Sequence, residues 1–304
     1  MTVPEEGRPL AGVLWMVATG LLFVGVTAAV KHAAGRLPAA EAAFLRYALG
    51  LVFLLPMLGS LRRNRPRRRD LGVYALRGGV HSAGVILWFF AMTRLPIAEV
   101  TAMNYLAPIY VTLGAALLLG ERLALRRLLA IGVAFLGALV ILRPGFRDVS
   151  AGHLAMLGTA LAFAASYLMA KTLSGRAEPA MVVAMLSTWV TVGLAPVALS
   201  VWIAPTAAEV LWLLAVAAMA TGAHYTMTLA FRAAPVTVTQ PVTFLQLIWA
   251  TILGWWAFGE RPDAFVLGGG AAILGAVSFI AWREAQLRRR GALSPPPAPA
   301  AREG

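Results

Sequence analysis

Six ionisable side chains lie inside long apolar stretches of the sequence. They are Glu41, Arg46, Arg77, His81, Glu99 and His224. An ionisable group at the centre of a membrane costs roughly 2.5–3.5 kcal/mol on insertion scales, so such residues are functional candidates by default. The cation at Arg46 also needs a partner when it is buried. The sequence leaves that partner open among a substrate carboxylate, a backbone carbonyl, Glu41 and Glu99.

Other polar and aromatic side chains converge on the depth of Arg46. If the stretches are helices that rise about 1.5 Å per residue, Arg46 and His81 fall near the middle of their spans. The residues predicted to bind a substrate at this depth are Arg46, His81, Trp88, Asn104, Tyr105, His224, Tyr225 and Gln246, with Glu41 and Glu99 as candidates for ion coupling. The alternative interpretation is that these side chains make only interhelical hydrogen bonds and aromatic packing contacts.

Helical spacing indicates which way one of these groups faces. Arg77, His81, Gly84 and Trp88 lie on one face of a helix, because the last three follow Arg77 by about one, two and three turns. A polar stripe that faces lipid would be unstable, so this face is expected to look inward.

Sequence motifs typical of enzymes are missing. The chain has no HExxH helix, no GxSxG turn and no P-loop. It has no cysteine, and its four histidines lie in four separate regions, so no metal site, cofactor or catalytic residue is predicted. Two functions remain open for these residues. One is a membrane enzyme that uses His81 and His224 for acid–base work, and the other is a channel or sensor.

The elements that must position these residues are membrane-spanning helices. The chain is 60% hydrophobic and only 13% charged, against about 25% charged residues in soluble domains. Its apolar residues come in blocks of about 20, the length that crosses a bilayer core. Ten spans are predicted, at 11–30, 38–59, 71–92, 96–119, 124–142, 151–171, 179–203, 208–231, 235–258 and 263–282. The fold class is therefore an all-α integral membrane protein with ten transmembrane helices.

The basic residues set the expected orientation. They lie in short loops between the apolar blocks, which does not suggest nucleic-acid binding despite the net charge of +13. With the N-terminus in the cytoplasm, the inside segments hold 17 Lys and Arg residues and the outside segments hold 6. Because cytoplasmic loops carry the excess of positive charge, both termini are predicted to be cytoplasmic.

An internal repeat divides the chain into two halves. A shift of 140 residues aligns Lys31 with Lys171, and a shift of 139 aligns Pro96 with Pro235 and Gly120-Glu121-Arg122 with Gly259-Glu260-Arg261. Each half holds five predicted spans, so the second half must enter the membrane from the opposite side. Inverted repeats are typical of secondary transporters, which bind substrate near the midplane between the halves. Glu121 and Glu260 end their spans, where each is expected to pair with a nearby arginine.

These motifs resemble the EamA module of the drug/metabolite transporter superfamily. The first copy is carried by Trp88 to Met92, Pro96, Leu106-Ala107-Pro108 and Leu119 to Arg122, together with Arg46 in the second span. The second copy runs from Leu229 through Pro235 to Arg261 and then Gly270 to Gly275. The resemblance implies ten spans in two inverted five-helix repeats and transport of small metabolites without ATP. Pro108 aligns with Leu247, so a helix break at that point is expected in the first half alone.

The expected protein is thus a secondary transporter or facilitative carrier for an amino acid, an organic acid or a nucleoside- or vitamin-like compound. Residues 1–10 form a cytoplasmic segment, 11–148 and 149–284 the two repeats, and 285–304 a disordered basic and proline-rich tail. The expected location is a bacterial-type inner membrane, and the expected partners are the substrate and lipid, with no nucleic acid. Coupling to a proton or ion, and assembly as a homodimer, remain open.

Overall fold

The computed structural model describes residues 9–33, 35–57, 68–119, 124–146, 148–174, 177, 179–234, 239 and 241–293. This part of the chain is helical throughout and contains no β-strand. Most of the predicted N-terminal segment, residues 58–67 with the first part of the basic loop Arg62–Asp70, the Gly120-Glu121-Arg122 motif and residues 294–304 lie outside the described residues.

Seven helices of the described chain are long and apolar enough to cross a membrane. They are α1 (Pro9–Ala33), α4 (Arg68–Met92), α7 (Leu125–Leu142), α8 (Ala151–Ser174), α9 (Pro179–Ser200), α10 (Ala207–Ala233) and α13 (Ala264–Leu293). Each coincides with one of the ten predicted spans. Helix α13 continues to Leu293, well beyond residue 285, where the predicted disordered tail begins.

The other three predicted spans are present as interrupted helices. They are α2 (Ala39–Gly50) with the 3₁₀ helix η1 (Leu51–Met57), α5 (Ile97–Asn104) with α6 (Ala107–Leu119), and the 3₁₀ helix η2 (Pro241–Thr243) with α12 (Phe244–Phe258). Of these pieces, α12 is a shorter apolar helix. The described chain therefore holds seven helices long enough to cross a membrane, with shorter helical pieces in the other three predicted spans.

The break between α5 and α6 lies one turn before Pro108. This proline has no N–H to donate to the Asn104 carbonyl, and its ring crowds that carbonyl, so the helix is interrupted after Asn104. Leu247, the residue aligned with Pro108, lies inside α12, so the break is not symmetric at that position, as expected; the second half changes from a 3₁₀ to an α-helix a few residues earlier. Thr243, where η2 gives way to α12, is the residue that the 139-residue shift aligns with Asn104, where α5 ends. The second half uses Pro241 at the start of η2 in place of a proline at the position of Leu247.

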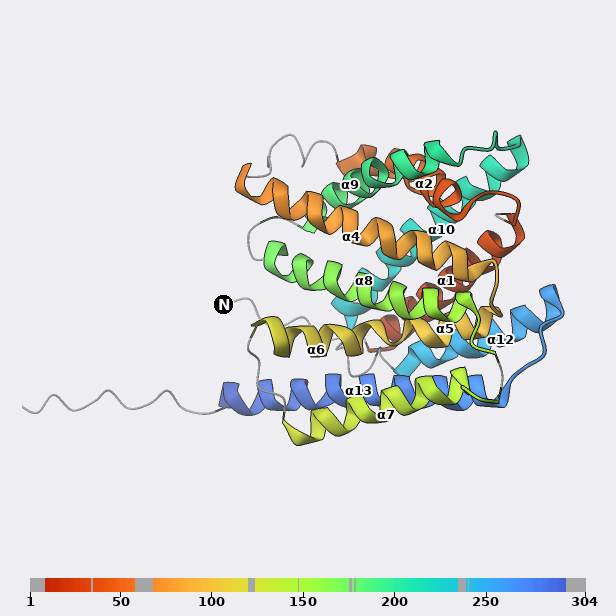
Figure 1. Ribbon diagram of the computed structural model, residues 1–304. Coiled ribbons are helices and arrows are strands. Elements are labelled where there is room, and N and C mark those ends of the chain that lie inside the picture. The colour runs from red at the N-terminus through yellow and green to blue at the C-terminus, as the bar shows by residue number, and fades with distance from the viewer. Residues whose placement is uncertain are drawn as a thin grey trace, which may run out of the picture.

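The helix contacts are the same when each helix is replaced by its counterpart in the other half. Helix α1 corresponds to α8, and α4 corresponds to α10. Helix α1 packs along α10, and α8 packs along α4 in the same way. Helices α7 and α13 are each other's counterparts, and they lie side by side along one edge of the bundle (Figure 1). The largest buried apolar cluster takes residues from both halves, including Phe89, Met103, Met156 and Leu213. The core therefore lies between the halves as well as within them.

Candidate functional site

His81 is the centre of a polar cluster that joins the two halves. Its side chain is on α4, and the residue is only 7% exposed. The Nε2 atom lies 3.2 Å from the Tyr47 hydroxyl on α2, and the Nδ1 atom lies 3.1 Å from Ser166 Oγ on α8. Phe163, one turn before Ser166, stacks on the imidazole with ring centroids 4.6 Å apart. The first half thus supplies the histidine, and the second half covers one face of its ring.

The α4 face predicted to look inward does so. Arg77 and Gly84 are buried, and Arg77 donates a hydrogen bond from Nη1 to the Val182 carbonyl at 3.1 Å. A Cβ built on Gly84 would lie 2.9 Å from the ring of Phe163, so only a glycine allows α8 to approach this closely. Trp88 lies edge-on to Phe163, with centroids 6.1 Å apart.

Arg46 lies beside this cluster and contacts an aromatic ring. Its guanidinium carbon is 4.0 Å from the centroid of the Tyr47 ring, a cation–π distance. Among the described residues, the buried Nε of Arg46 finds no hydrogen-bond partner, and neither do Trp88 Nε1 and Asn104 Oδ1. Buried polar atoms are nearly always hydrogen-bonded, so each such atom requires an explanation. Two unpaired donors and one unpaired acceptor are what a polar ligand would complete.

Asn104 and Tyr105 lie at the break between α5 and α6. The Tyr105 hydroxyl donates to the Thr243 carbonyl at 2.8 Å, so the two helix breaks are hydrogen-bonded to each other across the halves. Helix α5 also packs on both α4 and α8, the helices that carry His81 and Ser166.

The three remaining predicted residues differ in their surroundings. His224 on α10 meets the edge of Phe23 on α1, with centroids 5.4 Å apart, and it lies within electrostatic reach of both Arg46 and His81. Gln246 on α12 lies against Gly20 of α1. The Tyr225 side chain is 66% exposed on the apolar outer surface. The structure therefore brings His81 close to Arg46 and His224, with Trp88 beside Phe163, and it does not bring Tyr225 to them.

The two coupling candidates lie at one end of the bundle. Glu41 is fully buried in the first turn of α2, where Oε2 accepts the Ile203 N–H at 2.9 Å and Oε1 has no partner among the described residues. Glu99 is buried in the first turn of α5, 2.7 Å from His153 Nε2. Neither carboxylate pairs with Arg46.

The sequence suggested that Glu260 pairs with a nearby arginine, and the structure shows a different partner. Its carboxylate instead forms an ion pair with Lys31, at the end of α1. The corresponding expectation for Glu121 lies outside the described residues.

Three partners of His81 were not predicted from the sequence: Tyr47, Phe163 and Ser166. The internal repeat held a signal for one of them, because Phe23 and Phe163 are identical residues under the 140-residue shift. In the structure each of these two phenylalanines contacts a histidine of the other half. Among the described residues, no group of three His, Asp or Glu side chains could hold a metal ion.

Comparisons with known proteins agree with this architecture. Residues 10–143 and residues 150–282 each match the EamA-like transporter family. A riboflavin transporter of Vibrio cholerae is 31% identical over 93% of this chain and 97% of that protein, and one of Rhizobium johnstonii is 32% identical over 95% and 96%. An S-adenosylmethionine uptake transporter of Rickettsia prowazekii is 27% identical over 84% and 86%. A solved structure has the same fold, with a TM-score of 0.61 over 94% of this chain at 20% identity.

These relatives are named as transporters, in agreement with the prediction of a carrier and not an enzyme. The seven long apolar helices are those of a multi-pass membrane protein. The resemblance found in the sequence motifs is confirmed twice along the chain, once in each half. The chain therefore belongs to the EamA-like transporter family, whose matched members here carry small metabolites across membranes.

Proposed function

We propose that this protein carries a flat, partly aromatic metabolite of the vitamin class, and that the substrate binds between the halves beside His81. The observation that carries the proposal is the makeup of the His81 cluster. Tyr47, His81 and Trp88 come from the first half, whereas Phe163 and Ser166 come from the second. A site shared by both halves changes shape when the halves move relative to each other, as alternating access requires.

The chemistry of the cluster favours a ring with polar edges. Aromatic side chains offer faces and edges for stacking, and stacked pairs contribute about 0.5–1.5 kcal/mol beyond area burial. The unpaired atoms at Arg46, Trp88 and Asn104 offer two N–H donors and one acceptor. A heteroaromatic ring with carbonyl and N–H groups, as in riboflavin, complements that set. A carboxylate on the substrate would be bound by Arg46, so organic acids form the second substrate class.

The proposed carrier crosses a bacterial inner membrane ten times, as two inverted repeats with both termini in the cytoplasm. The seven long helices, and the shorter helical pieces in the three remaining predicted spans, support ten crossings. An odd number of crossings in each half makes the repeats inverted. Broken helices are tolerated in a membrane where neighbouring protein satisfies their backbone groups, as the Tyr105–Thr243 hydrogen bond does here.

Counterflow in proteoliposomes tests the proposal. Purified full-length protein should take up labelled riboflavin in a saturable manner, and unlabelled riboflavin inside the vesicles should accelerate uptake. S-adenosylmethionine and a dicarboxylate serve as competing solutes from other chemical classes. Flux that is neither saturable nor accelerated would point to a channel instead.

A pair of tryptophan variants locates the binding site in the same assay. Trp88→Ala removes an indole beside the His81 cluster and should abolish riboflavin counterflow. Trp256→Ala removes the same side chain from the outer surface, where it is 79% exposed, and should leave counterflow near the wild-type level. Equal losses in both variants would contradict the placement of the site.

A further inference from the structure

One end of the helix bundle is closed by polar contacts between the two halves. We call it the Lys31 face. It is the end where α4 and α7 finish and where α8 and α13 begin (Figure 1). Among the described residues, three ion pairs lie there, Lys31–Glu260, Arg36–Glu209 and Arg143–Asp263, together with the Glu99–His153 hydrogen bond. Each joins a residue of the first half to a residue of the second.

Glu260 is the most heavily used of these groups. One carboxylate oxygen pairs with Lys31 at the end of α1, and the other accepts the Ile97 N–H at 2.8 Å in the first turn of α5. Lys31 also donates to the Leu95 carbonyl at 2.7 Å. A Cβ on Gly254 would clash with the Glu260 carboxylate, so the glycine leaves room for this pairing. A single second-half side chain thus binds two elements of the first half.

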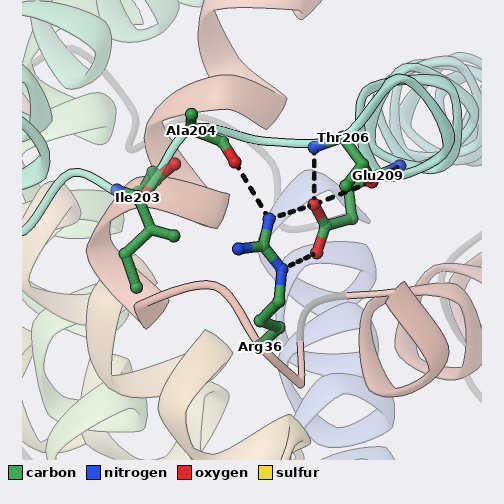
Figure 2. Close-up of polar contacts among 6 residues, drawn as sticks. Arg36, Ile203, Ala204, Thr206 and Glu209 are labelled. Carbon is green, nitrogen blue, oxygen red and sulfur yellow. Dashed lines mark hydrogen bonds and ion pairs between the residues drawn. The ribbon is translucent and has the colours of Figure 1, made fainter.

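Arg36 makes a second, separate connection, shown in Figure 2. Its Nε and Nη2 atoms lie 2.9 and 2.6 Å from the two oxygens of Glu209, and Nη2 also donates to the Ala204 carbonyl at 3.0 Å. The hydrogen bond from Arg36 to Glu209 raises the pKa of the guanidinium, so the arginine stays charged. Glu209 in turn caps α10 through Thr206. The contact therefore ties the α1–α2 connection to the start of α10.

These ion pairs are suited to opening as well as to closing. Lys31, Glu260, Arg143 and Asp263 keep between 13% and 27% of their side chains exposed, and Arg36 is the most exposed of the cations, at 47%. Water can therefore replace these contacts as the halves separate. Several contacts that break together close this end firmly but reversibly.

We propose that the cross-half contacts of the Lys31 face are the gate that closes this side of the carrier. The gate rests on the proposed alternating access, since substrate can leave beside Lys31 only when the halves separate there. Opening then breaks Lys31–Glu260, Arg36–Glu209 and Arg143–Asp263 as a set. The repeat assigns Lys171 and Glu121 to the positions of Lys31 and Glu260. Glu121 and the Lys171 side chain lie outside the described residues, so we confine the gate to the Lys31 face.

Accessibility of the His81 cluster tests the gate without knowledge of the substrate. The chain has no cysteine, so Ser166→Cys places a single thiol beside His81. An impermeant thiol reagent is applied to right-side-out and inside-out vesicles containing the full-length protein. Lys31→Glu should increase labelling severalfold from the side that carries the Lys31 face and not from the other. Lys31→Glu combined with Glu260→Lys should restore protection.

Two further variants test whether the labelling depends on the ion pairs and not on a change of charge alone. Arg261→Glu makes the same change of charge at an exposed neighbouring position and should leave labelling unchanged. Glu209→Arg breaks the second connection at the protein surface and should raise labelling as Lys31→Glu does, whereas its combination with Arg36→Glu should lower it again.

The outcomes separate the gate from the proposed substrate. Unchanged labelling in Lys31→Glu and Glu209→Arg, with counterflow intact, would overturn the gate and leave the carrier function standing. Increased labelling that each charge swap reverses would support the gate even if riboflavin is not carried. Increased labelling that neither swap reverses would also overturn it, because the effect would then not depend on the pairing.

Discussion

At the scale of single residues, Arg46 is a cation whose hydrogen bonding is incomplete. Its guanidinium stacks on Tyr47, but its buried Nε lacks a hydrogen-bond partner among the described residues. The carboxylates of Glu41 and Glu99, both considered as partners, bond Ile203 and His153 instead. A cation–π contact compensates only part of the cost of burying a charge. The geometry thus favours a ligand over an internal ion pair as the missing partner.

Substitutions at Arg46 should separate ligand binding from assembly. Arg46→Ala removes a charged hydrogen-bond donor, which contributes about 1.5–3 kcal/mol, so kcat/KM for uptake should fall by roughly 10- to 100-fold. Arg46→Lys keeps the charge but loses the planar fork, and it should mainly raise KM. Uptake kinetics in proteoliposomes measure both, with the exposed Arg261→Ala as the matched control.

Wild-type kinetics in Arg46→Ala would show that the side chain does not contact the substrate. Failure of that variant to accumulate in the membrane would instead indicate a structural role, and the Arg46→Lys variant would then decide, because a structural cation should be replaceable by lysine without a change in KM.

At the scale of helices, glycines set how closely the two halves approach. A Cβ built on Gly269 of α13 would lie 2.5 Å from the Gly137 carbonyl oxygen of α7 and 2.6 Å from Ile141 Cγ1. Neither neighbour can move freely, since one is backbone and the other is buried. Small residues at such crossings let transmembrane helices associate through backbone contact. The α7–α13 contact therefore depends on glycine at both positions.

Gly269→Val should destabilise the protein by about 1–3 kcal/mol, the typical cost of overpacking a tight interface. The expected result is a lower Tm for purified protein in detergent. Gly268→Ala is the matched control, because a Cβ there would meet nothing within 4 Å. A Tm for Gly269→Val equal to that of the control would contradict the close approach of α7 and α13.

At the scale of the whole molecule, the two halves behave as equivalent bodies. Exchange of the halves converts the α1–α10 contact into the α8–α4 contact, and it leaves the α7–α13 and α2–α9 contacts unchanged. Such a pattern indicates a two-fold relation between the repeats. If each half crosses the membrane five times, as we propose, the axis of that relation lies in the plane of the membrane.

Single cysteines should reveal the corresponding topology. We expect cysteines in the loops at Arg62–Asp70 and Arg122–Arg127 to be protected from an impermeant thiol reagent in intact cells. Cysteines at Arg143–Ala151 and Gly259–Asp263, on the Lys31 face, should be labelled. The naturally cysteine-free chain supplies the unlabelled background. Labelling of the Arg62–Asp70 loop from outside would refute the predicted orientation.

The helices themselves could be predicted from the sequence because a transmembrane helix is a local property. A block of about 20 apolar residues forms one wherever it occurs, since the bilayer leaves backbone groups no other partner. The repeat was visible for the same reason, as it required only comparison of one stretch with another. The seven long helices and the inward face of α4 accordingly lie where the sequence placed them.

Only the tertiary structure decided which of the buried polar groups meet. His81 finds Ser166, 85 residues away, and Lys31 finds Glu260, 229 residues away. Glu260 was expected to pair with an arginine nearby, but its partner depends on how α1 packs beside α12 and α5. Such choices follow from the relative position of helices in the two halves. Spacing along one helix specifies which face a residue occupies, but it carries no information about the helix that will cover that face.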